Sequence, residues 1–293
     1  MKILGKVHNG NYDILMCEDG TKIRRTEGDS FIPEKPESLD LKCPNRCPMG
    51  CKCCHEDSKR DGKHGDIMNL KFIDTLLPYT ELAIGGGNPL EHPDLIPFLK
   101  KCKEKKLICN ITVNQMHFMS NQDLIKKLVD EKLIWGLGVS LVSITPEFLF
   151  LVKQYPNAVI HLINGIHSVD EIKKLYDQDL KILFLGYKEF RRGKAFYDKT
   201  VEYEKERTDV FLPEIIEHFK VVSFDNLALD QLHVKSLLTP AQWDQFFLGA
   251  DGQHTMYVDA VARTFSKSSI TPIEERQPLL DDIKPMFDYV RTH

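Results

Sequence analysis

Five of the eight cysteines, Cys43, Cys47, Cys51, Cys53 and Cys54, lie within a twelve-residue stretch of the chain. Three of them, Cys47, Cys51 and Cys54, are separated by three and then by two residues, so that one loop carries three thiolates. Three thiolates can hold a cubane iron–sulfur cluster and leave one iron without a protein ligand. Such an iron can bind a small chelating molecule, which a four-cysteine site cannot do without losing a ligand.

Two other interpretations of the cysteines stay open. Cys43, Cys47 and Cys51 form a second possible ligand set, although only the set that begins at Cys47 has the three-then-two spacing. A structural zinc site is the other alternative. Zinc usually takes four ligands as two separated pairs, and the sequence has no second cysteine pair, so His55 or His64 would have to complete the site.

The remaining cysteines, Cys17, Cys102 and Cys109, are scattered along the chain. A disulfide framework would distribute its cysteines over a small secreted chain. This chain has 293 residues, and its N-terminus lacks the long apolar stretch of an export signal. We therefore expect the protein to work in the reducing cytoplasm, and we expect these three cysteines to be small buried residues.

Composition and charge narrow the classes further. The chain is 42% hydrophobic and 28% charged, and its net charge is 39 − 43 = −4. No apolar run approaches the ~20 residues that span a bilayer, so we expect no membrane partner, and the collagen-like and disordered classes are excluded. The acidic balance disfavours a large nucleic-acid partner. However, a basic run, Lys188, Arg191, Arg192 and Lys194, is compatible with either an anion site or a solvated surface.

The elements that position these residues follow from the apolar pattern. Residues 1–37 predict a β-hairpin element, with runs Lys2–Val7 and Tyr12–Cys17 around the turn signal Asn9-Gly10. From residue 38 the pattern becomes strand–helix alternation. The predicted strands are mostly apolar on both faces, as in a parallel sheet covered by helices. They are Leu39–Cys43, Glu81–Ile84, Leu107–Val113, Ile134–Leu141, Ala158–Ile163 and Lys181–Leu185.

Capping and proline signals predict where the helices begin. The predicted starts are Asn69, Pro93, Ser120, Thr145 and Ser168, the last with a capping-box partner at Glu171. In the less regular final part, Val221–Phe224 is a possible seventh strand and Thr255–Val261 a further one. The aromatic residues Trp243, Phe246 and Phe247 are expected in the core. An amphipathic helix is expected over Pro278–Val290, with a kink or split at Pro285.

Six strand–helix units fit either an open doubly wound sheet or a partial (β/α)₆ barrel. The cysteines follow the first predicted strand, so they should lie at the carboxyl end of the sheet, where α/β folds place their sites. Polar or glycine-containing segments follow four later strands as well. They are Gly85-Gly86-Gly87-Asn88-Pro89, Asn114 at the end of the third strand, Ser140 in the fourth, and Asn164-Gly165 after the fifth.

This ordered set resembles the radical S-adenosylmethionine (radical SAM) superfamily, whose signature is a C-x₃-C-x₂-C loop after the first strand of a partial (β/α)₆ barrel. The resemblance covers roughly residues 38–195. It implies an α/β fold with a partial (β/α)₆ TIM-like barrel, an N-terminal β-hairpin at residues 1–37 and a C-terminal α+β capping region at residues 196–293. The hairpin, Gly-Gly-Gly-Asn-Pro and Ser-Phe-Asp-Asn-Leu-Ala-Leu are similar to a small, largely uncharacterised and partly phage-encoded subgroup.

The resemblance also implies site residues. Cys47, Cys51 and Cys54 would bind one [4Fe–4S] cluster, and S-adenosylmethionine would be held by Gly86, Gly87, Asn88, Asn114, Ser140 and Gly165. Three positions depart from the family pattern. Cys53 stands where an aromatic residue is usual, Asn88 where a glutamate is usual, and His161 where a glycine is usual.

The implied activity is reductive cleavage of S-adenosylmethionine to a 5′-deoxyadenosyl radical, which abstracts hydrogen from an unidentified substrate. No cysteine follows Cys109, so a single cluster is expected. A low-potential flavodoxin or ferredoxin would supply the electron. Two alternatives stay open: a zinc-stabilised, non-catalytic binding module, and a degenerate radical SAM fold that no longer cleaves S-adenosylmethionine.

Overall fold

A ten-stranded sheet with the order β10-β9-β8-β7-β6-β5-β4-β11-β12-β13 forms the main body of the protein. The structure is a computed structural model and describes residues 2–293. Neighbouring strands pair in parallel from β10 to β11, and β12 (Thr264–Ser266) and β13 (Gln277–Pro278) continue the sheet with antiparallel pairing. The parallel strands are β4 (Ser38–Lys42), β5 (Glu81–Gly85), β6 (Ile108–Asn114), β7 (Gly136–Ser140), β8 (Ala158–Ile163), β9 (Lys181–Leu185), β10 (Val221–Phe224) and β11 (Thr255–Asp259).

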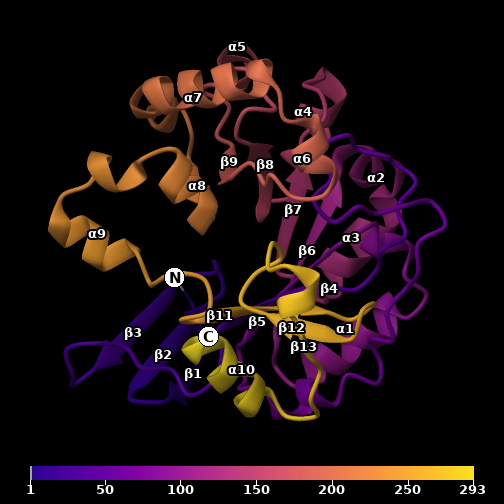
Figure 1. Ribbon diagram of the computed structural model, residues 1–293, viewed down its shortest axis with the longest axis vertical. Coiled ribbons are helices and arrows are strands. Elements are labelled where there is room, and N and C mark those ends of the chain that lie inside the picture. Colours follow the sequence, from indigo (N-terminus) through magenta and orange to yellow (C-terminus); the bar gives the residue numbers. More distant parts are fainter. Residues whose placement is uncertain (1) are drawn as a thin grey trace.

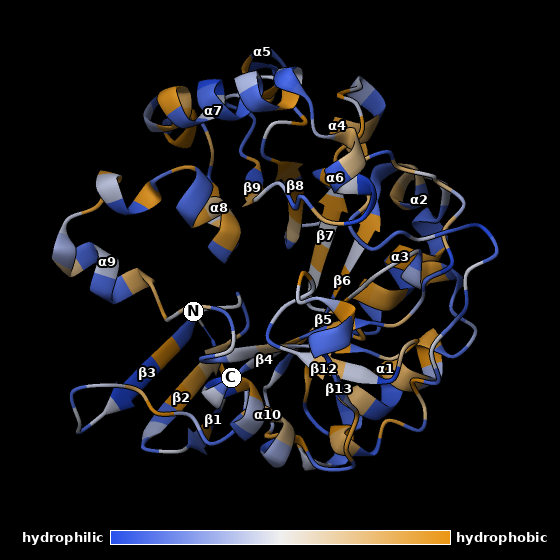
Figure 2. Cartoon of the chain, viewed as in Figure 1, coloured by the Kyte–Doolittle hydropathy of each residue, from blue (hydrophilic) through white to orange (hydrophobic). Residues whose placement is uncertain are grey.

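One face of this sheet is apolar and packs under helices. Successive side chains of a strand point to opposite faces, and on this face they are buried aliphatic and aromatic residues such as Leu41, Ile84, Val113, Leu162 and Phe184. Figure 1 shows the helices outside the arc of strands, and Figure 2 shows their mixed apolar and polar sides. The covering helices are α1 (Leu95–Glu104), α2 (Gln115–Ser120), α3 (Gln122–Asp130), α4 (Pro146–Val152), α5 (Val169–Ile172) and α7 (Lys199–Glu217).

On β4 to β7 the opposite face is polar and contains glycine, whereas on β8 and β9 it includes apolar residues such as Leu183, which is in register with His161. The strand register aligns Asp40 with Ala83, and it aligns Asn114 with Ser140 and Ser140 with His161. The prediction that the strands are mostly apolar on both faces is therefore wrong for this face of β4 to β7. The reason is physical: only one face is covered by helices, and the other lines the interior towards which the strands curve (Figure 1).

Side chains join the two sides of the curved sheet. Asn226 follows β10, Asp251 precedes β11, and the Nδ2 of Asn226 donates to an oxygen of Asp251 at 2.6 Å. In a flat sheet, seven strand spacings would separate β10 from β11 by about 34 Å. Lys188, after β9, also donates to Ser269 at 3.0 Å. In residues 2–293 these contacts, rather than strand pairing, bridge the opening, because β10 and β13 are the edges of the sheet.

Several local predictions are confirmed. Ala158–Ile163, Lys181–Leu185 and Val221–Phe224 are strands with those limits. Ser168 and Glu171 form the reciprocal hydrogen bonds of a capping box at α5. Thr145 accepts a hydrogen bond from the Phe148 amide at the start of α4.

Three predicted helix starts are wrong. Asn69 donates to the Asp66 carboxylate at 2.8 Å instead of capping a helix, and only a 3₁₀ turn, Lys71–Thr75, follows it. Pro93 lies two residues before α1 begins. Ser120 is the last residue of α2, where its hydroxyl donates to the Met116 carbonyl.

The N-terminal residues form a separate three-stranded antiparallel sheet of β1 (Ile3–Asn9), β2 (Tyr12–Cys17) and β3 (Lys22–Thr26). A buried carboxylate, Glu37, fastens it to the main body. Tyr12 donates to Glu37 at 2.6 Å, and Arg24 donates to both of its oxygens. His254, from the C-terminal part, lies 3.7 Å from the same carboxylate.

The C-terminal part corrects two further predictions. The final helix, α10 (Ile283–Thr292), begins five residues later than expected because Pro278 belongs to β13. Pro285 then falls in the first turn, where its missing amide proton costs nothing, so it does not split the helix.

The shorter helices are α6 (Arg192–Phe196), α8 (Asn226–Gln231) and α9 (Pro240–Phe246). No residue of α9 is buried, and Phe246 is 68% exposed, so its aromatic residues are not core residues.

The scattered cysteines and the apolar runs can also be compared with the structure. Cys17, Cys102 and Cys109 are buried free thiols, as expected. Among residues 2–293, no helix combines the length and the apolar character needed to cross a membrane.

Candidate functional site

The cysteine loop leaves the carboxyl end of β4 and returns to it. Backbone hydrogen bonds between its two arms hold it in shape: Asn45 donates to Lys63 at 2.7 Å, Cys47 donates to Lys59 at 2.8 Å, and Gly65 donates to Cys43 at 2.7 Å. The loop is therefore an ordered structure in which all five clustered cysteines lie at the carboxyl edge of the sheet.

Cys47, Cys51 and Cys54 are partly buried free thiols. Burial raises the pKa of Cys47 and of Cys51, and the neighbouring thiols raise both further, because thiolates repel one another. In residues 2–293, no set of three or more His, Cys, Asp or Glu side chains is already arranged to hold a metal ion. The donor set nevertheless fits an iron–sulfur cluster in type, because three neighbouring thiols are not engaged in disulfides.

Cys43 has different surroundings from these three. Its side chain is fully buried, and its thiol donates to the Gly85 carbonyl at 3.7 Å. Burial raises its pKa well above the ordinary range, which disfavours the thiolate that metal binding needs. These surroundings favour the ligand set that begins at Cys47 over the set that begins at Cys43.

The glycine segment after β5 packs directly against the cysteine loop. Gly87 donates to the Pro44 carbonyl at 2.7 Å, and Asn88 donates to the Arg46 carbonyl at 2.7 Å. Gly86 has φ +105°, and a Cβ there would lie 2.5 Å from the Pro44 oxygen. A Cβ on Gly87 would come even closer to the Arg46 oxygen. Glycine is therefore required here by the cysteine loop itself, whether or not a ligand binds.

Asn88 is 1% exposed and uses its side chain locally. Its carbonyl oxygen accepts from the Leu90 amide at 3.3 Å, and its Nδ2 donates to Glu91 at 3.0 Å. It thereby caps the short 3₁₀ helix Pro89–Glu91. The structure brings Asn88 beside the cysteine loop but gives its side chain a capping role.

Two residues, one at the end of β6 and one in the helix α2 that follows it, reach the cysteine thiols. The Nδ2 of Asn114 lies 3.8 Å from the sulfur of Cys51, and the Nε2 of His117 lies 3.6 Å from the sulfur of Cys47. Burial lowers the pKa of His117, so its ring is biased towards the neutral form. The sequence analysis included Asn114 and missed His117, whose one sequence signal is its place just after the third strand of the parallel core.

Ser140 and Gly165 lie further along the same edge. Ser140 pairs with Asn114 on one side and His161 on the other, so all three share the polar face. Gly165 has φ +82°, and a Cβ there would lie 2.7 Å from the backbone oxygen of Val201 in α7. Packing against α7 thus accounts for Gly165 without a ligand.

His161 occupies space that Gly138, which has no side chain, leaves free. A Cβ on Gly138 would lie 2.5 Å from its Nε2 and 2.9 Å from the Thr112 hydroxyl. His161 is 8% exposed, and its Nδ1 has no hydrogen-bond partner among the described residues. Burial lowers its pKa to about 4, so the ring is neutral at pH 7.

Asp40 marks a recess on the polar face. Its side chain is solvent-accessible, yet the surrounding protein raises its pKa to about 6 by desolvation. Lys188 lowers this pKa, while Asp251 and Asp225 raise it. A carboxylate that water reaches but protein surrounds lies in an internal recess, and these charges reach it from the opposite side of the curved sheet.

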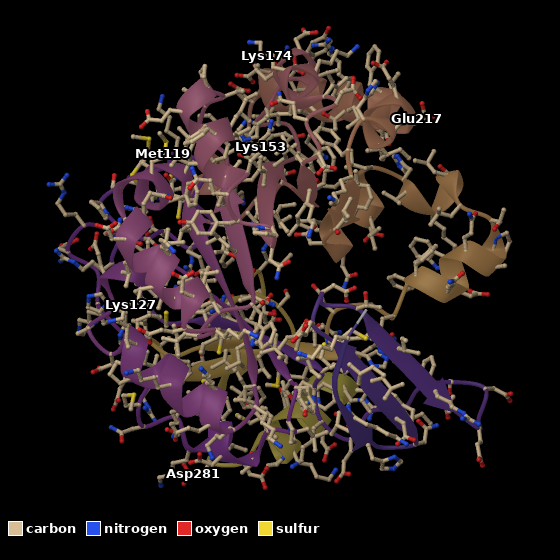
Figure 3. All side chains as sticks on the ribbon, turned by 180° about the vertical axis from the view of Figure 1, so that it is seen from behind. Met119, Lys127, Lys153, Lys174, Glu217 and Asp281 are labelled. Carbon is tan, nitrogen blue, oxygen red and sulfur yellow. The ribbon has the colours of Figure 1, made fainter. Side chains whose placement is uncertain are left out.

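The basic run after β9 contacts the cysteine loop. Arg191 donates to the Glu56 carbonyl at 2.8 Å, and Arg192 donates to the Ser58 carbonyl at 2.5 Å and pairs with Asp57 at 3.0 Å. The two arginines therefore support the loop instead of forming a free basic surface. By contrast, Lys174, Glu217 and Asp281 project at the outer rim (Figure 3).

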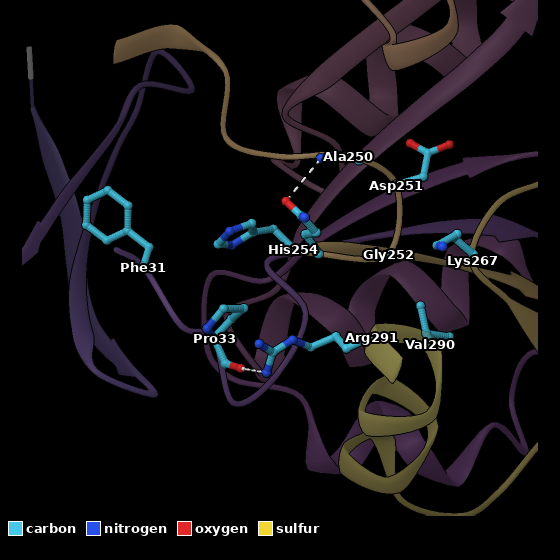
Figure 4. Close-up of a pocket in the computed structure, with 10 residues that line it drawn as sticks. Phe31, Pro33, Ala250, Asp251, Gly252, His254, Lys267, Val290 and Arg291 are labelled. Carbon is cyan, nitrogen blue, oxygen red and sulfur yellow. Dashed lines mark hydrogen bonds between the residues drawn. The ribbon is translucent and has the colours of Figure 1, made fainter. Parts of the chain in front are cut away.

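A separate cavity of about 370 Å³ lies away from the cysteines, where the N-terminal segment meets the C-terminal part. It is lined by Phe31, Pro33, His254, Lys267 and Arg291 among others, and Arg291 donates to the Pro33 carbonyl at 2.9 Å (Figure 4). None of the predicted site residues lines it.

Comparisons with known proteins find a similar fold in solved structures. No family model and no curated protein matches the sequence. The structure of Streptococcus suis SuiB bound to S-adenosylmethionine is similar, with a TM-score of 0.64 and 14% identity over 89% of this chain and 69% of that chain. Native anSMEcpe with bound AdoMet is also similar, with a TM-score of 0.56 and 13% identity over 85% of this chain and 80% of that chain.

A third similar structure is SuiB bound to the precursor peptide SuiA, with a TM-score of 0.61 and 16% identity. At these identities the likeness establishes the shared α/β fold with its large parallel sheet. The chemistry of this protein must therefore be inferred from its own residues, above all from the cysteine loop at the carboxyl end of β4.

Proposed function

We propose that this protein is a radical SAM enzyme with one [4Fe–4S] cluster. The observation that carries the proposal is the placement of Cys47, Cys51 and Cys54 as free, partly buried thiols on the loop after β4, in a fold shared with structures that contain S-adenosylmethionine. The narrower resemblance to a partly phage-encoded subgroup belongs to the same proposal.

We also propose that the curved sheet is a partial (β/α)₆ barrel over residues 38–195, with residues 1–37 and 196–293 as added parts. The parallel order from β4 to β9 supports this division, as does the separate sheet of β1–β3. The contact between Asn226 and Asp251 further supports a barrel-like curvature.

Cys47, Cys51 and Cys54 would hold the cluster, and Gly86, Gly87, Asn88, Asn114, Ser140 and Gly165 would surround S-adenosylmethionine. A bound and reduced cluster would supply the one electron that the reductive cleavage of S-adenosylmethionine to methionine and a 5′-deoxyadenosyl radical requires. The packing of Gly87 against Pro44 and the contact of Asn114 with Cys51 support placing the cofactor beside the loop.

The polar face of the sheet would orient the substrate beneath the cofactor. His161 is neutral at pH 7 and buried, so it can accept or donate a hydrogen bond there without adding charge. The apolar face and its helices exclude water from the other side of the strands.

We further propose that a low-potential flavodoxin or ferredoxin donates the electron.

The contacts of Arg191 and Arg192 with the cysteine loop account for both arginines without a nucleic-acid partner.

Anaerobic reconstitution with iron and sulfide, followed by reduction in the presence of S-adenosylmethionine, tests the proposed function. We expect about four irons per chain for this cluster type, and release of 5′-deoxyadenosine. A colourless protein with stoichiometric zinc would instead indicate a zinc-stabilised module. An iron-loaded protein that leaves S-adenosylmethionine intact would indicate a degenerate radical SAM fold.

A further inference from the structure

Glu56, two residues after Cys54, is a buried carboxylate that four other residues approach. Its side chain is 7% exposed. Lys42 lies 2.7 Å from Oε2, and the Tyr257 hydroxyl donates to Oε1 at 3.2 Å. Arg191 lies 3.7 Å from Oε2 and also donates to the Glu56 backbone carbonyl at 2.8 Å, and His55 lies 3.5 Å from Oε1.

These contacts continue into the C-terminal part of the chain. Lys42 also pairs with Asp259 at 3.3 Å, and Asp259 lies 3.6 Å from Arg276. Arg276 in turn stacks over the Tyr257 ring at 5.0 Å. The side chains of Lys42, Asp259 and Arg276 are each at most 4% exposed, so the network is hardly screened by solvent.

The network joins elements that are distant in the sheet. Lys42 ends β4, Tyr257 and Asp259 lie in β11 next to it, and Arg191 follows β9 on the far side of the curved sheet. Glu56 is the one residue of the cysteine loop whose carboxylate contacts all three regions among the described residues. A buried charge holds its position strongly because each partner that moves away leaves it uncompensated.

We propose that Glu56 is a positioning residue that fixes the cysteine loop against β11 and the loop after β9, so that the three thiols face one another. The C-terminal strands, which contain no cysteine, thereby become necessary for loading the iron–sulfur site. This inference rests on the proposed function for the identity of the bound group. The positioning itself concerns the metal-free chain.

The test compares wild type with Glu56→Gln as full-length, metal-free protein. Glutamine keeps the shape of the side chain but removes the charge that faces Lys42 and Arg191. Mass spectrometry would follow the alkylation of Cys47, Cys51 and Cys54 by iodoacetamide. We expect roughly tenfold faster alkylation in the variant, because a loop that opens more often exposes thiols that are only partly accessible in the closed loop. The iron bound per chain after reconstitution should fall, while the far-ultraviolet circular dichroism stays unchanged.

Arg191→Ala is the second variant, because its side chain is partly exposed and the buried Lys42–Glu56 pair remains. It should show a smaller increase in alkylation, and it decides the question if Glu56→Gln does not fold. Asp281→Asn is the matched control, since it removes an exposed ion pair with Lys71. It should behave as wild type does.

Alkylation and iron loading equal to those of wild type in a folded Glu56→Gln protein would overturn the proposal. So would unchanged values in Arg191→Ala if Glu56→Gln is unfolded. If wild type itself bound no iron, the proposed function would fail. The alkylation rates of the metal-free variants would still decide whether Glu56 positions the loop.

Discussion

At the scale of single residues, burial separates the five clustered cysteines into different chemical types. Cys43 lies fully inside the core, whereas Cys47, Cys51 and Cys54 remain partly accessible. A metal ligand must lose its proton and reach the metal, and both requirements favour the partly accessible thiols. Cys53 is also partly buried, but it interrupts the three-then-two spacing instead of belonging to it.

The first prediction concerns these ligands. Replacement of Cys47, Cys51 and Cys54 together by alanine should abolish iron binding, because no thiolate of the proposed set remains. Cys43→Ala should leave the iron content near that of wild type, since its thiol faces the Gly85 carbonyl. Iron analysis after anaerobic reconstitution measures both. Equal iron content in the triple variant and in wild type would contradict the assignment.

The second prediction concerns His161 and pH. Its pKa is lowered to about 4 in the folded protein, whereas an unfolded histidine titrates near 6.5. Between these values the unfolded chain binds the extra proton, so the free energy of unfolding falls as the pH falls below about 6.5. Between about pH 7 and pH 5 the free energy of unfolding should therefore fall by about 2 kcal/mol less in His161→Gln than in wild type. Urea unfolding at both values measures the difference, and an identical pH dependence would contradict the buried neutral ring.

At the scale of elements, the strands were predictable and the helix starts only in part. Runs such as Ala158–Ile163 indicate strands locally, because they are short, apolar and rich in β-branched residues. The capping box at Ser168 is equally local. Asn69 was not predictable from its neighbourhood, because its amide has a competing partner in Asp66. The end of α2 at Ser120 likewise depends on how α2 packs.

The third prediction concerns the contact between the loop after β8 and α7. Gly165→Ala would place a Cβ 2.7 Å from the Val201 carbonyl, in addition to the strain of a positive φ. Gly20→Ala has a similar φ of +88° and open space around the Cβ, so it is a matched control. We expect a cost of about 1 kcal/mol for Gly20→Ala and roughly 2–3 kcal/mol for Gly165→Ala, because displaced packing adds to backbone strain. If the two variants had equal free energies of unfolding, close packing of α7 against Gly165 would be contradicted.

At the scale of the whole molecule, buried charged residues join parts that are far apart in sequence. Glu37 links the N-terminal sheet to His254, and Glu56 links the cysteine loop to Tyr257, which is 201 positions away. The sequence placed the site residues at successive strand ends because parallel strands share one carboxyl edge. The roles of Glu37 and Glu56 were not predictable, because a single glutamate in a loop gives no sequence signal of a partner so distant.

The fourth prediction concerns Glu37. Burial alone would raise its pKa, but the hydrogen bonds and charge of Arg24, together with the nearby His254 and Lys22, outweigh burial and hold the pKa below the ordinary range. Its contribution to stability is therefore present above the unfolded pKa near 4.5 and is lost as the pH falls below that value. Glu37→Ala should cost about 3–5 kcal/mol at neutral pH, since Arg24 and Lys22 lose a buried partner. Asp130→Asn, which removes an exposed pair with Lys126, should leave the urea midpoint unchanged. A midpoint for Glu37→Ala as high as that of Asp130→Asn would contradict the role of Glu37.

The central claim is that the thiols after β4 support reductive cleavage of S-adenosylmethionine, and one measurement tests it most directly. Reconstituted wild type and the triple variant of Cys47, Cys51 and Cys54 would be incubated anaerobically with S-adenosylmethionine and a strong reductant, and 5′-deoxyadenosine would be quantified. The account predicts 5′-deoxyadenosine from wild type and none above background from the variant. Intact S-adenosylmethionine with iron-loaded wild type, or equal product from both proteins, would contradict it.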